Sequence, residues 1–276
     1  MRRKGLFIIM SLCLLLASYP SRGCAQFVYG NTGLLHLPTA EMQKDKTVML
    51  GGAWLAERAI PDSHNYGWDR DGTFNYFLNV TFFPWLEISY TCTLIRGKYL
   101  AEHRGLNPKD FNYWANQDRH LDFRLRVWKE GWWKSWTPQI VIGMNDFLHT
   151  FGESNLGMTD SGNGYWSRIY VAATKHEKIP GVGEMGAHVA YMYNERKDFL
   201  YDGMGVGVNF RLNGLQTSSE FLNKSLKGLN LMMECDSRTM NAGASYSFWK
   251  DFFHVVFEMN DLKYFSGGIY CKLHLK

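Results

Sequence analysis

Residues 119–147 read RHLDFRLRVWKEGWWKSWTPQIVIGMNDF, and this stretch decides the fold. In its first arm, from Leu121 to Val127, apolar and charged residues alternate without a break, so the predicted strand has one apolar and one charged face. The turn that follows is crowded with tryptophan, whose indole combines an apolar body with one N–H donor and favours the boundary between membrane and water. The stretch predicts one hairpin of a membrane barrel, with an aromatic girdle formed by Trp85, Trp128, Trp132, Trp133, Trp136 and Trp249.

The same alternation recurs from Thr47 onward, in segments of about ten residues separated by polar connections. The clearest segments are LEISYTCTL at 86–94 and MGVGVNFRL at 204–212. We predict twelve strands: Thr47–Ala56, Thr73–Phe82, Leu86–Leu94, Arg119–Trp128, Gln139–Phe147, Gly164–Thr174, Glu184–Tyr193, Asp202–Leu212, Leu229–Cys235, Met240–Phe248, Phe252–Met259 and Phe265–Leu275.

The connections between these strands alternate between short and long. An even number of strands then places both termini on the side of the short turns, as expected for a barrel inserted from the periplasm. One connection breaks the rule, because Asn213–Gly228 is long and falls on the short-turn side, where SSEFLNKSLKG favours a helix. The short turns are Phe83–Trp85, Lys129–Pro138, Lys175–Gly183 and Trp249–Asp251, and the long loops are Glu57–Gly72, Ile95–Asp118 and Phe151–Asn163.

The fold class that we predict is an all-β, transmembrane, antiparallel up-and-down β-barrel of about 12 strands. A closed sheet pairs every backbone N–H and C=O without helices, and a charge facing lipid near the midplane costs roughly 2–4 kcal/mol. The outward residues around Ile88, Phe123, Val189, Val208 and Val255 are free of charge. A soluble sandwich is the alternative, but it would usually have about seven shorter strands. The absence of long apolar runs beyond the first segment argues against helical spans.

The first segment has the pattern of a secretory signal peptide, with a basic start, an apolar run from Leu6 to Ala17 and small residues before Gln26. We predict a signal peptide at 1–25, cleaved before Gln26; a signal anchor and a lipoprotein modified at Cys24 are the alternatives. Cleavage leaves 26 basic and 26 acidic residues, a balance that argues against a nucleic-acid partner. The cysteines that remain, Cys92, Cys235 and Cys271, show no disulfide or metal spacing.

Residues 26–46 precede the first clear strand, and we expect them to form a periplasmic entry segment to a barrel at 47–276. The segment contains two glycines and one proline and ends in a charged run. A short strand is expected at Leu34–Leu37. Gly33 permits a turn before it, and Pro38 ends it.

Polar residues on the inward faces are the first group of candidate site residues. They could form a polar path that hydrogen-bonds sugar hydroxyls, or a cross-strand network of salt bridges that fills a small barrel. His188 and His254 lie alone on the inward face and are expected to be polar fillers. The candidates are Glu87, Asp122, Arg124, Arg126, Arg168, Asn209, Arg211 and Glu234.

Aromatic residues of the long loops are the second group, namely Tyr66, Trp68, Tyr113 and Trp114. They could stack on sugar rings while residues 69–71 (DRD) supply hydrogen bonds. Alternatively, they belong to the outer girdle or pack the loops over the barrel mouth.

Several ordered blocks resemble the first barrel region of the YjbH family. They are GNTGLLHLPTAEM (Gly30–Met42), VTFFPWLEISYT (Val80–Thr91), LDFRLRVWKEGWW (Leu121–Trp133), PQIVIGMNDFLHTFGES (Pro138–Ser154) and YVAATK (Tyr170–Lys175). The resemblance implies an outer-membrane protein associated with exopolysaccharide or capsule production and export, acting alongside other secretion components. The longer members of the family continue well beyond this length and carry a convincing lipobox, which leaves open whether this chain exports a polymer itself.

We therefore expect a non-enzymatic barrel of the cell outer membrane, without cofactor or metal. Its expected partners are outer-membrane lipid, polysaccharide and other secretion components. A structural or assembly partner with a closed lumen is the main alternative. An outer-membrane lipid-modifying enzyme is another, but it would need a nucleophile and a base within hydrogen-bond reach at a membrane rim, and no His-x-Ser pairing on one strand face is present.

Overall fold

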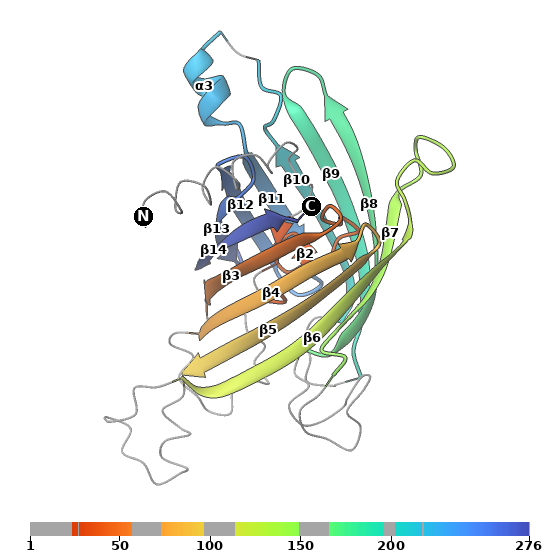
Figure 1. Ribbon diagram of the computed structural model, residues 1–276, viewed down its shortest axis with the longest axis vertical. Helices are drawn as coiled ribbons and strands as arrows, with labels where there is room; N and C mark the ends of the chain where they lie inside the picture. Colours follow the sequence, from red (N-terminus) through yellow and green to blue (C-terminus); the bar gives the residue numbers. More distant parts are fainter. Residues whose placement is uncertain are drawn as a thin grey trace, which may run out of the picture.

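The computed structural model describes residues 24–26, 28–56, 73–96, 114–148, 166–195, 202–216 and 218–275. Twelve antiparallel strands, β3 to β14, form a closed barrel in chain order, and β14 pairs with β3 to complete it (Figure 1). The predicted up-and-down barrel of twelve strands is confirmed. The strands are β3 (Thr47–Leu55), β4 (Thr73–Phe83), β5 (Leu86–Arg96), β6 (Trp114–Trp128), β7 (Gln139–Asn145), β8 (Arg168–Ile179), β9 (Gly183–Tyr193), β10 (Gly203–Arg211), β11 (Leu229–Cys235), β12 (Met240–Phe248), β13 (Phe253–Asn260) and β14 (Tyr264–His274).

The observed strand bounds follow the prediction closely, and β11 and β12 have the predicted bounds. β8 departs most, because it continues through the charged residues of Lys175–Lys178, which were expected to lie in a turn. His176 lies within this extension and is buried, since its ring contacts carboxylates inside the barrel mouth. β7 ends two residues early, because Asp146 adopts a positive φ of 52° and leaves the strand conformation.

Side chains alternate across the barrel wall as the sequence predicts. Glu87 and Arg124 point inward and are fully buried, whereas large apolar residues such as Leu50 and Val208, 60% and 48% exposed, point outward. An apolar outer face and a polar inner face are the arrangement that a barrel in hydrocarbon requires.

The short connections lie at one end of the barrel as predicted, whereas the long loops predicted at Glu57–Gly72, Ile95–Asp118 and Phe151–Asn163 fall mostly or wholly outside the described residues. In Figure 1 the turns β4–β5, β6–β7 and β8–β9 lie at the same end of the barrel as α3 (Glu220–Ser225). The helix begins where Ser219 accepts a hydrogen bond from the Leu222 N–H, so the long connection at this end contains the expected helix. No helix among the described residues is long and apolar enough to span a membrane. We call this end the short-turn mouth.

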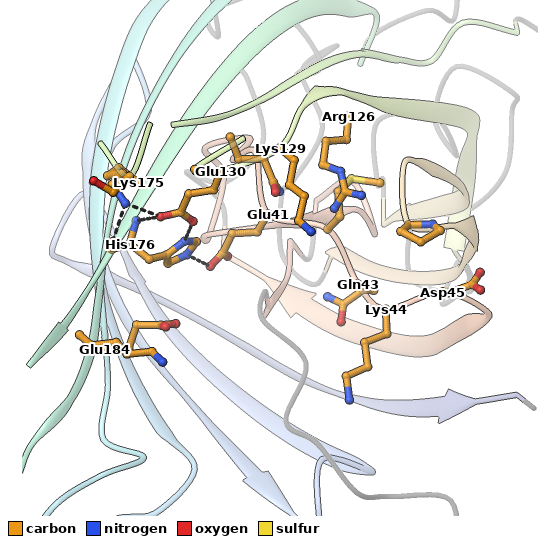
Figure 2. A pocket seen from close by; sticks show the side chains of 16 residues that line it. Glu41, Gln43, Lys44, Asp45, Arg126, Lys129, Glu130, Lys175, His176 and Glu184 are labelled. Atoms are coloured by element: carbon orange, nitrogen blue, oxygen red, sulfur yellow. Dashed lines mark hydrogen bonds and ion pairs between the residues drawn. The ribbon is translucent and has the colours of Figure 1, made fainter. Parts of the chain in front are cut away.

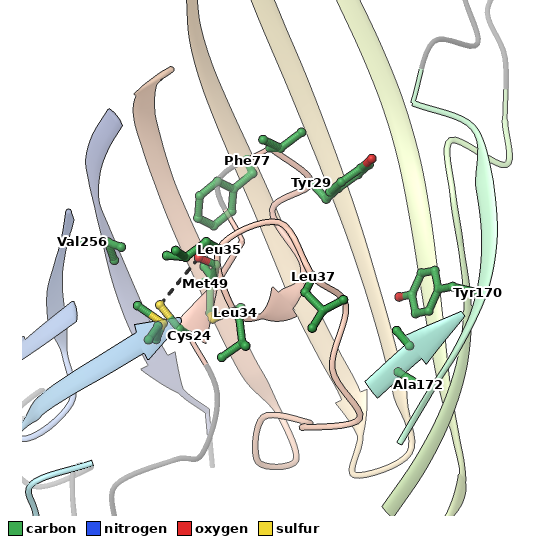
Figure 3. Packing of buried hydrophobic residues seen from close by; sticks show 14 of the residues in the cluster. Cys24, Tyr29, Leu34, Leu35, Leu37, Met49, Phe77, Tyr170, Ala172 and Val256 are labelled. Carbon is green, nitrogen blue, oxygen red and sulfur yellow. Dashed lines mark hydrogen bonds between the residues drawn. The ribbon is translucent and has the colours of Figure 1, made fainter. Parts of the chain in front are cut away.

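The N-terminal segment occupies the barrel interior, which the sequence did not lead us to expect. Residues 24–26 and 28–43, here called the plug, are buried throughout. They include a two-stranded sheet of β1 (Cys24–Ala25) and β2 (Thr32–Gly33). Figure 3 shows the plug leucines packed among inward side chains of the wall, such as Phe77 and Tyr170. The entry segment expected at 26–46 is thus a lumen plug over most of its length, and its last residues, 44–46, are exposed.

Glycines of the wall explain how the plug fits. A Cβ atom on Gly207 of β10 would lie 2.5 Å from Leu34 Cδ1, and a Cβ atom on Gly243 of β12 would lie 2.8 Å from Leu35 Cδ2. Both distances are too short for real atoms, so these glycines form sockets for the leucines. The plug and the inward glycines of the strands therefore pack as one core.

The prediction of a short strand at Leu34–Leu37 is wrong, because these residues form a turn. The Leu34 N–H donates to the Leu37 carbonyl at 3.2 Å, and Gly33 pairs with Pro38 across it. The turn aims its leucines at different strands of the wall, which a regular strand could not do.

Candidate functional site

Glu87 of β5 holds one side of the plug. Its carboxylate accepts hydrogen bonds from the Thr32 N–H at 2.7 Å, the Thr32 hydroxyl at 2.8 Å and the Asn79 amide at 2.8 Å. Arg124 of β6 forms an ion pair with Glu87 at 3.0 Å and donates to the Glu41 carbonyl at 2.9 Å. Two predicted lumen residues therefore bind the plug through its backbone.

Glu234 of β11 holds the opposite side. Its oxygens accept the backbone N–H groups of Leu35 and His36 at 3.0 and 2.7 Å, and that of Leu37 at 3.2 Å. A carboxylate that accepts several N–H groups of one turn fixes the shape of that turn. The leucine turn is therefore attached to the wall as a rigid unit.

His36, at the tip of the leucine turn, lies between two carboxylates. Nδ1 is 3.1 Å from Asp236 and Nε2 is 2.6 Å from Glu258. Burial acts to lower the pKa of His36, but the two carboxylates outweigh it and raise the pKa to about 10. The imidazolium ion then links the plug to the end of the barrel opposite the short-turn mouth, since Asp236 follows β11 at that end.

Residues His36, Glu234 and Asp236 also form a group that could hold a metal ion, with ligand atoms within 4.8 Å of one another. Each of these side chains already has hydrogen-bond partners within the plug and the wall. Hydrogen bonding accounts for the arrangement of the group, so we assign it to plug attachment.

Arg168 and Asp122 are two further buried charges of the inner wall, and each has several partners. The Arg168 guanidinium lies 3.9 Å from the centre of the Tyr29 ring and donates to the Asn145 side chain at 2.8 Å. Asp122 accepts from the Asp146 N–H at 2.7 Å and contacts the His120 ring at 3.0 Å. Both charges are fully buried, and both have partners.

A chain of hydrogen bonds links β8, β9 and β10 beneath the plug. The Thr174 hydroxyl lies 2.9 Å from His188 Nδ1, and His188 Nε2 lies 2.9 Å from the Asn209 side-chain oxygen. The same hydroxyl accepts the Ala40 N–H of the plug at 2.8 Å. His188 is therefore a polar residue of the inner face with hydrogen-bond partners, as expected, and it belongs to a network; His254 contacts Asp251 near the short-turn mouth.

The predicted lumen residues are thus all placed on the inner wall, and most of them contact the plug or support residues that do. Two of them, Arg211 and Arg126, lie at the short-turn mouth, and Arg211 contacts the plug residue Glu41. Arg211 is half-buried there and pairs with Glu184 at 3.2 Å and with Glu41, and Arg126 is half-buried beside the β6–β7 turn. Sequence reasoning missed His36 and Glu41, although both lie in the block Gly30–Met42.

The predicted aromatic residues are only partly within the described structure. Tyr66, Trp68 and Tyr113 lie outside the described residues, and Trp114 is described only as the backbone start of β6. Five of the girdle tryptophans lie at the short-turn mouth and are 47–72% exposed: Trp85, Trp132, Trp133, Trp136 and Trp249. Trp128 is half-buried at the end of β6, with its ring 5.3 Å from that of Trp132.

A hollow of about 890 Å³ opens at the short-turn mouth, between the end of the plug and the β6–β7 turn (Figure 2). We call it the mouth hollow. Glu130 lies on one side of it and binds Lys175 at 2.8 Å and His176 at 2.7 Å. Burial acts to raise the pKa of Glu130, but these partners lower it to about 2. The lining residues are Glu41, Met42, Gln43, Lys44, Asp45, Pro84, Arg126, Lys129, Glu130, Gly131, Ser135, Gln139, Lys175, His176, Lys178 and Glu184.

These features define a class: a closed twelve-stranded barrel with an apolar outer face, whose own N-terminal segment fills the lumen. The chain belongs to the YjbH family, whose model, described as exopolysaccharide biosynthesis protein YbjH, matches residues 25–188. The resemblance read from the sequence is confirmed. A curated relative from Escherichia coli K12, described as the uncharacterized lipoprotein YjbH, is 27% identical over 180 residues. That match covers 63% of this chain but only 21% of the relative, so the chain spans about a fifth of the length of the relative it matches.

Two solved structures are also similar in outline. Outer membrane phospholipase A from Escherichia coli is 10% identical, with 84% of this chain and 90% of that chain covered and a TM-score of 0.35. The Salmonella typhi outer membrane phospholipase dimer with bound calcium is 9% identical, with 86% and 92% covered and a TM-score of 0.33. Likeness at this level carries no inference about activity.

Proposed function

We propose that this chain is a non-enzymatic barrel of the outer membrane that takes part in exopolysaccharide or capsule production, with its lumen closed by the plug. The family description supports the link to exopolysaccharide. The apolar outer face and the buried inner charges support the proposed location of the barrel in a membrane. The match to the curated relative covers only about a fifth of that relative's length. The activity and partners of the whole relative are therefore not transferred directly to this chain, and the partners of this barrel are part of the proposal.

The observation that carries the proposal is the plug itself. Residues 24–26 and 28–43 are buried and are attached to opposite walls by Glu87 and Glu234. A polymer could cross this barrel only after the plug left. The arrangement therefore favours a closed structural or assembly partner over a permanently open export channel.

Planar-bilayer recording tests the closed lumen. The purified full chain should give no stable conductance steps, whereas the double variant Glu87→Gln with Glu234→Gln should give intermittent steps. A matched control is Glu177→Gln with Glu220→Gln, which removes the same charge from two exposed sites and should remain silent. Stable steps from the unmodified chain would refute the closed lumen.

The cellular part of the proposal needs its own test. Deleting the gene should lower the amount of surface polysaccharide, and complementation with the full chain should restore it. The chain should fractionate with the outer membrane. Normal polysaccharide in the deletion strain would contradict the proposed role.

The non-enzymatic part rests on the burial of the hydroxyl groups that contact an imidazole ring. Thr174 contacts His188, Thr47 contacts His274 at 2.7 Å, and both threonines are buried. Thr174, His188 and Asn209 have the order of a nucleophile, a base and an orienting group, but all are buried beneath the plug. A phospholipid at the outer surface has no access to this hydroxyl. Turnover of phospholipid by the purified chain, lost in Thr174→Val, would contradict this part of the proposal.

A further inference from the structure

We propose that the mouth hollow binds a carboxylate-bearing saccharide. The inference rests on the proposed function and names the class of ligand that the short-turn mouth would recognise. It begins from the charges around the hollow, because their pairing is uneven.

The buried acids of the hollow already have cationic partners. Glu41 accepts from Arg211 and, at 2.9 Å, from His176. Glu130 accepts from Lys175 at 2.8 Å, and Glu184 accepts from Arg211 at 3.2 Å. Figure 2 shows the contacts of Glu130 and Glu41 converging on His176 at one side of the hollow. These carboxylates therefore contribute little free negative charge to the remaining space.

Three cations of the hollow are available to a ligand. Within the described part of the chain, the side chains of Arg126, Lys129 and Lys178 form no hydrogen bond or ion pair. Among the acids of the hollow, Asp45 likewise forms no hydrogen bond or ion pair with the described residues, and it is exposed at the rim. In Figure 2 the side chains of Arg126 and Lys129 extend toward the plug residue Gln43. Unpaired cations in a concave site attract anions, and an arginine can bind a carboxylate through two parallel hydrogen bonds.

The size and the neutral lining favour a saccharide over a small ion. The volume of about 890 Å³ lies in the upper part of the range for small-molecule pockets, roughly 300–1,000 Å³. Gln43, Ser135 and Gln139 supply amide and hydroxyl groups that can hydrogen-bond sugar hydroxyls. No aromatic side chain among the described residues lines the hollow, so a neutral sugar would lack a stacking surface in this part of the structure.

The position of the hollow argues against a lipid headgroup as its ligand. Arg126 lies two residues after the buried Arg124 on β6, and Lys178 lies two residues after His176 on β8. Side chains two residues apart in a strand share a face, so both cations belong to the lumen side of the wall. A lipid at the outer surface would meet the opposite face.

Isothermal titration of the full chain in detergent tests the proposal, with trigalacturonate as the acidic probe and maltotriose as the neutral one. Trigalacturonate should bind with an affinity that falls as salt rises, and maltotriose should not bind detectably. The variant Arg126→Gln, Lys129→Gln, Lys178→Gln should lose at least tenfold in affinity. The matched variant Lys224→Gln, Lys227→Gln, Lys250→Gln removes three exposed charges outside the hollow and should stay within twofold.

Several outcomes would overturn the proposal. They are equal binding of both sugars, equal loss in both triple variants, and full displacement of trigalacturonate by equimolar inorganic phosphate, which would indicate a general anion site. Titration with anionic phospholipid micelles that depends on the same three cations would assign the site to lipid. Heat-modifiable migration in gels confirms that each variant is folded. Binding is measured on purified protein, so its failure is distinguishable from normal polysaccharide in the deletion strain.

Discussion

Replacing Glu87 with alanine should release the plug at one end while the barrel remains closed. Glu87 is fully buried, and its carboxylate is the ion-pair partner of Arg124, which is also fully buried. Breaking a buried pair by removing one partner costs about 3–5 kcal/mol, because a charge is left uncompensated. The substitution also leaves the Thr32 N–H without its acceptor at 2.7 Å.

The cost should fall on plug docking, because Thr32 belongs to the plug and Arg124 also binds plug carbonyls. Hydrogen–deuterium exchange read by mass spectrometry measures this directly. At about 1.4 kcal/mol for each factor of ten, protection of amides in residues 28–41 should fall by roughly two to three and a half orders of magnitude. Amides of β12 and β13, across the barrel, should keep their protection.

Two comparisons make the result interpretable. Glu87→Gln keeps the shape and one acceptor oxygen, so its loss of protection should be smaller than that of Glu87→Ala. Glu177→Ala, at an exposed site on β8, should leave the plug unchanged. Plug protection within threefold of the unmodified chain in Glu87→Ala would show that the Glu87 network does not hold the plug.

Three further predictions concern the plug. Gly207→Val should press on Leu34 and weaken docking by about 1–3 kcal/mol, seen as faster exchange at residues 34–37; unchanged exchange would contradict the socket. The pKa of His36 is raised to about 10, so its protonated ring contributes stability that is complete below about pH 6.5 and is lost as the pH rises through about 10. Hydrogen exchange of the plug, corrected for its intrinsic rate, should therefore accelerate across that pH range in the native chain. The variant His36→Gln should show no such acceleration. Intact-mass spectrometry should find a mature chain that begins at Gln26 and carries no acyl chains, as the predicted cleavage requires; a triacylated mass would show that the chain is processed at Cys24 as a lipoprotein.

The wall of the barrel could be predicted because its signal is local. Each strand meets an apolar phase outside and a polar interior, so residues such as Leu121 and Asp122 must alternate wherever the strand runs. The helix after Asn213 was also predictable, because its serine cap precedes a short run of helix formers. The extension of β8 was not, since the charges of Lys175–Lys178 resemble a turn until their partners are known.

The plug could not be predicted from the same pattern. Strand alternation shows that an inner face is polar, but not whether water, cross-strand pairs or another segment covers it. Gly207 lies on the inner face of β10, and the alternation of that strand does not show that it forms a socket for Leu34. The leucine turn resembled a strand, because a tight turn held by the distant Glu234 leaves no local signal. The resemblance of Gly30–Met42 to the family showed that the segment is a recognisable part of the chain, but it did not show that the segment lies inside the barrel.

The two carboxylate anchors bear on how the barrel could open. β5 and β11 lie opposite each other in the closed ring, so Glu87 and Glu234 hold the plug from both sides. Glu234 accepts mainly backbone N–H groups, whereas Glu87 accepts one backbone N–H and several side-chain donors, and the two carboxylates have different partners. Effects at separate sites without shared partners usually add, so each single variant should loosen its own side, and only the double variant should free the lumen. Conductance from either single variant at the level of the double variant would mean that the plug moves as one body about a single attachment.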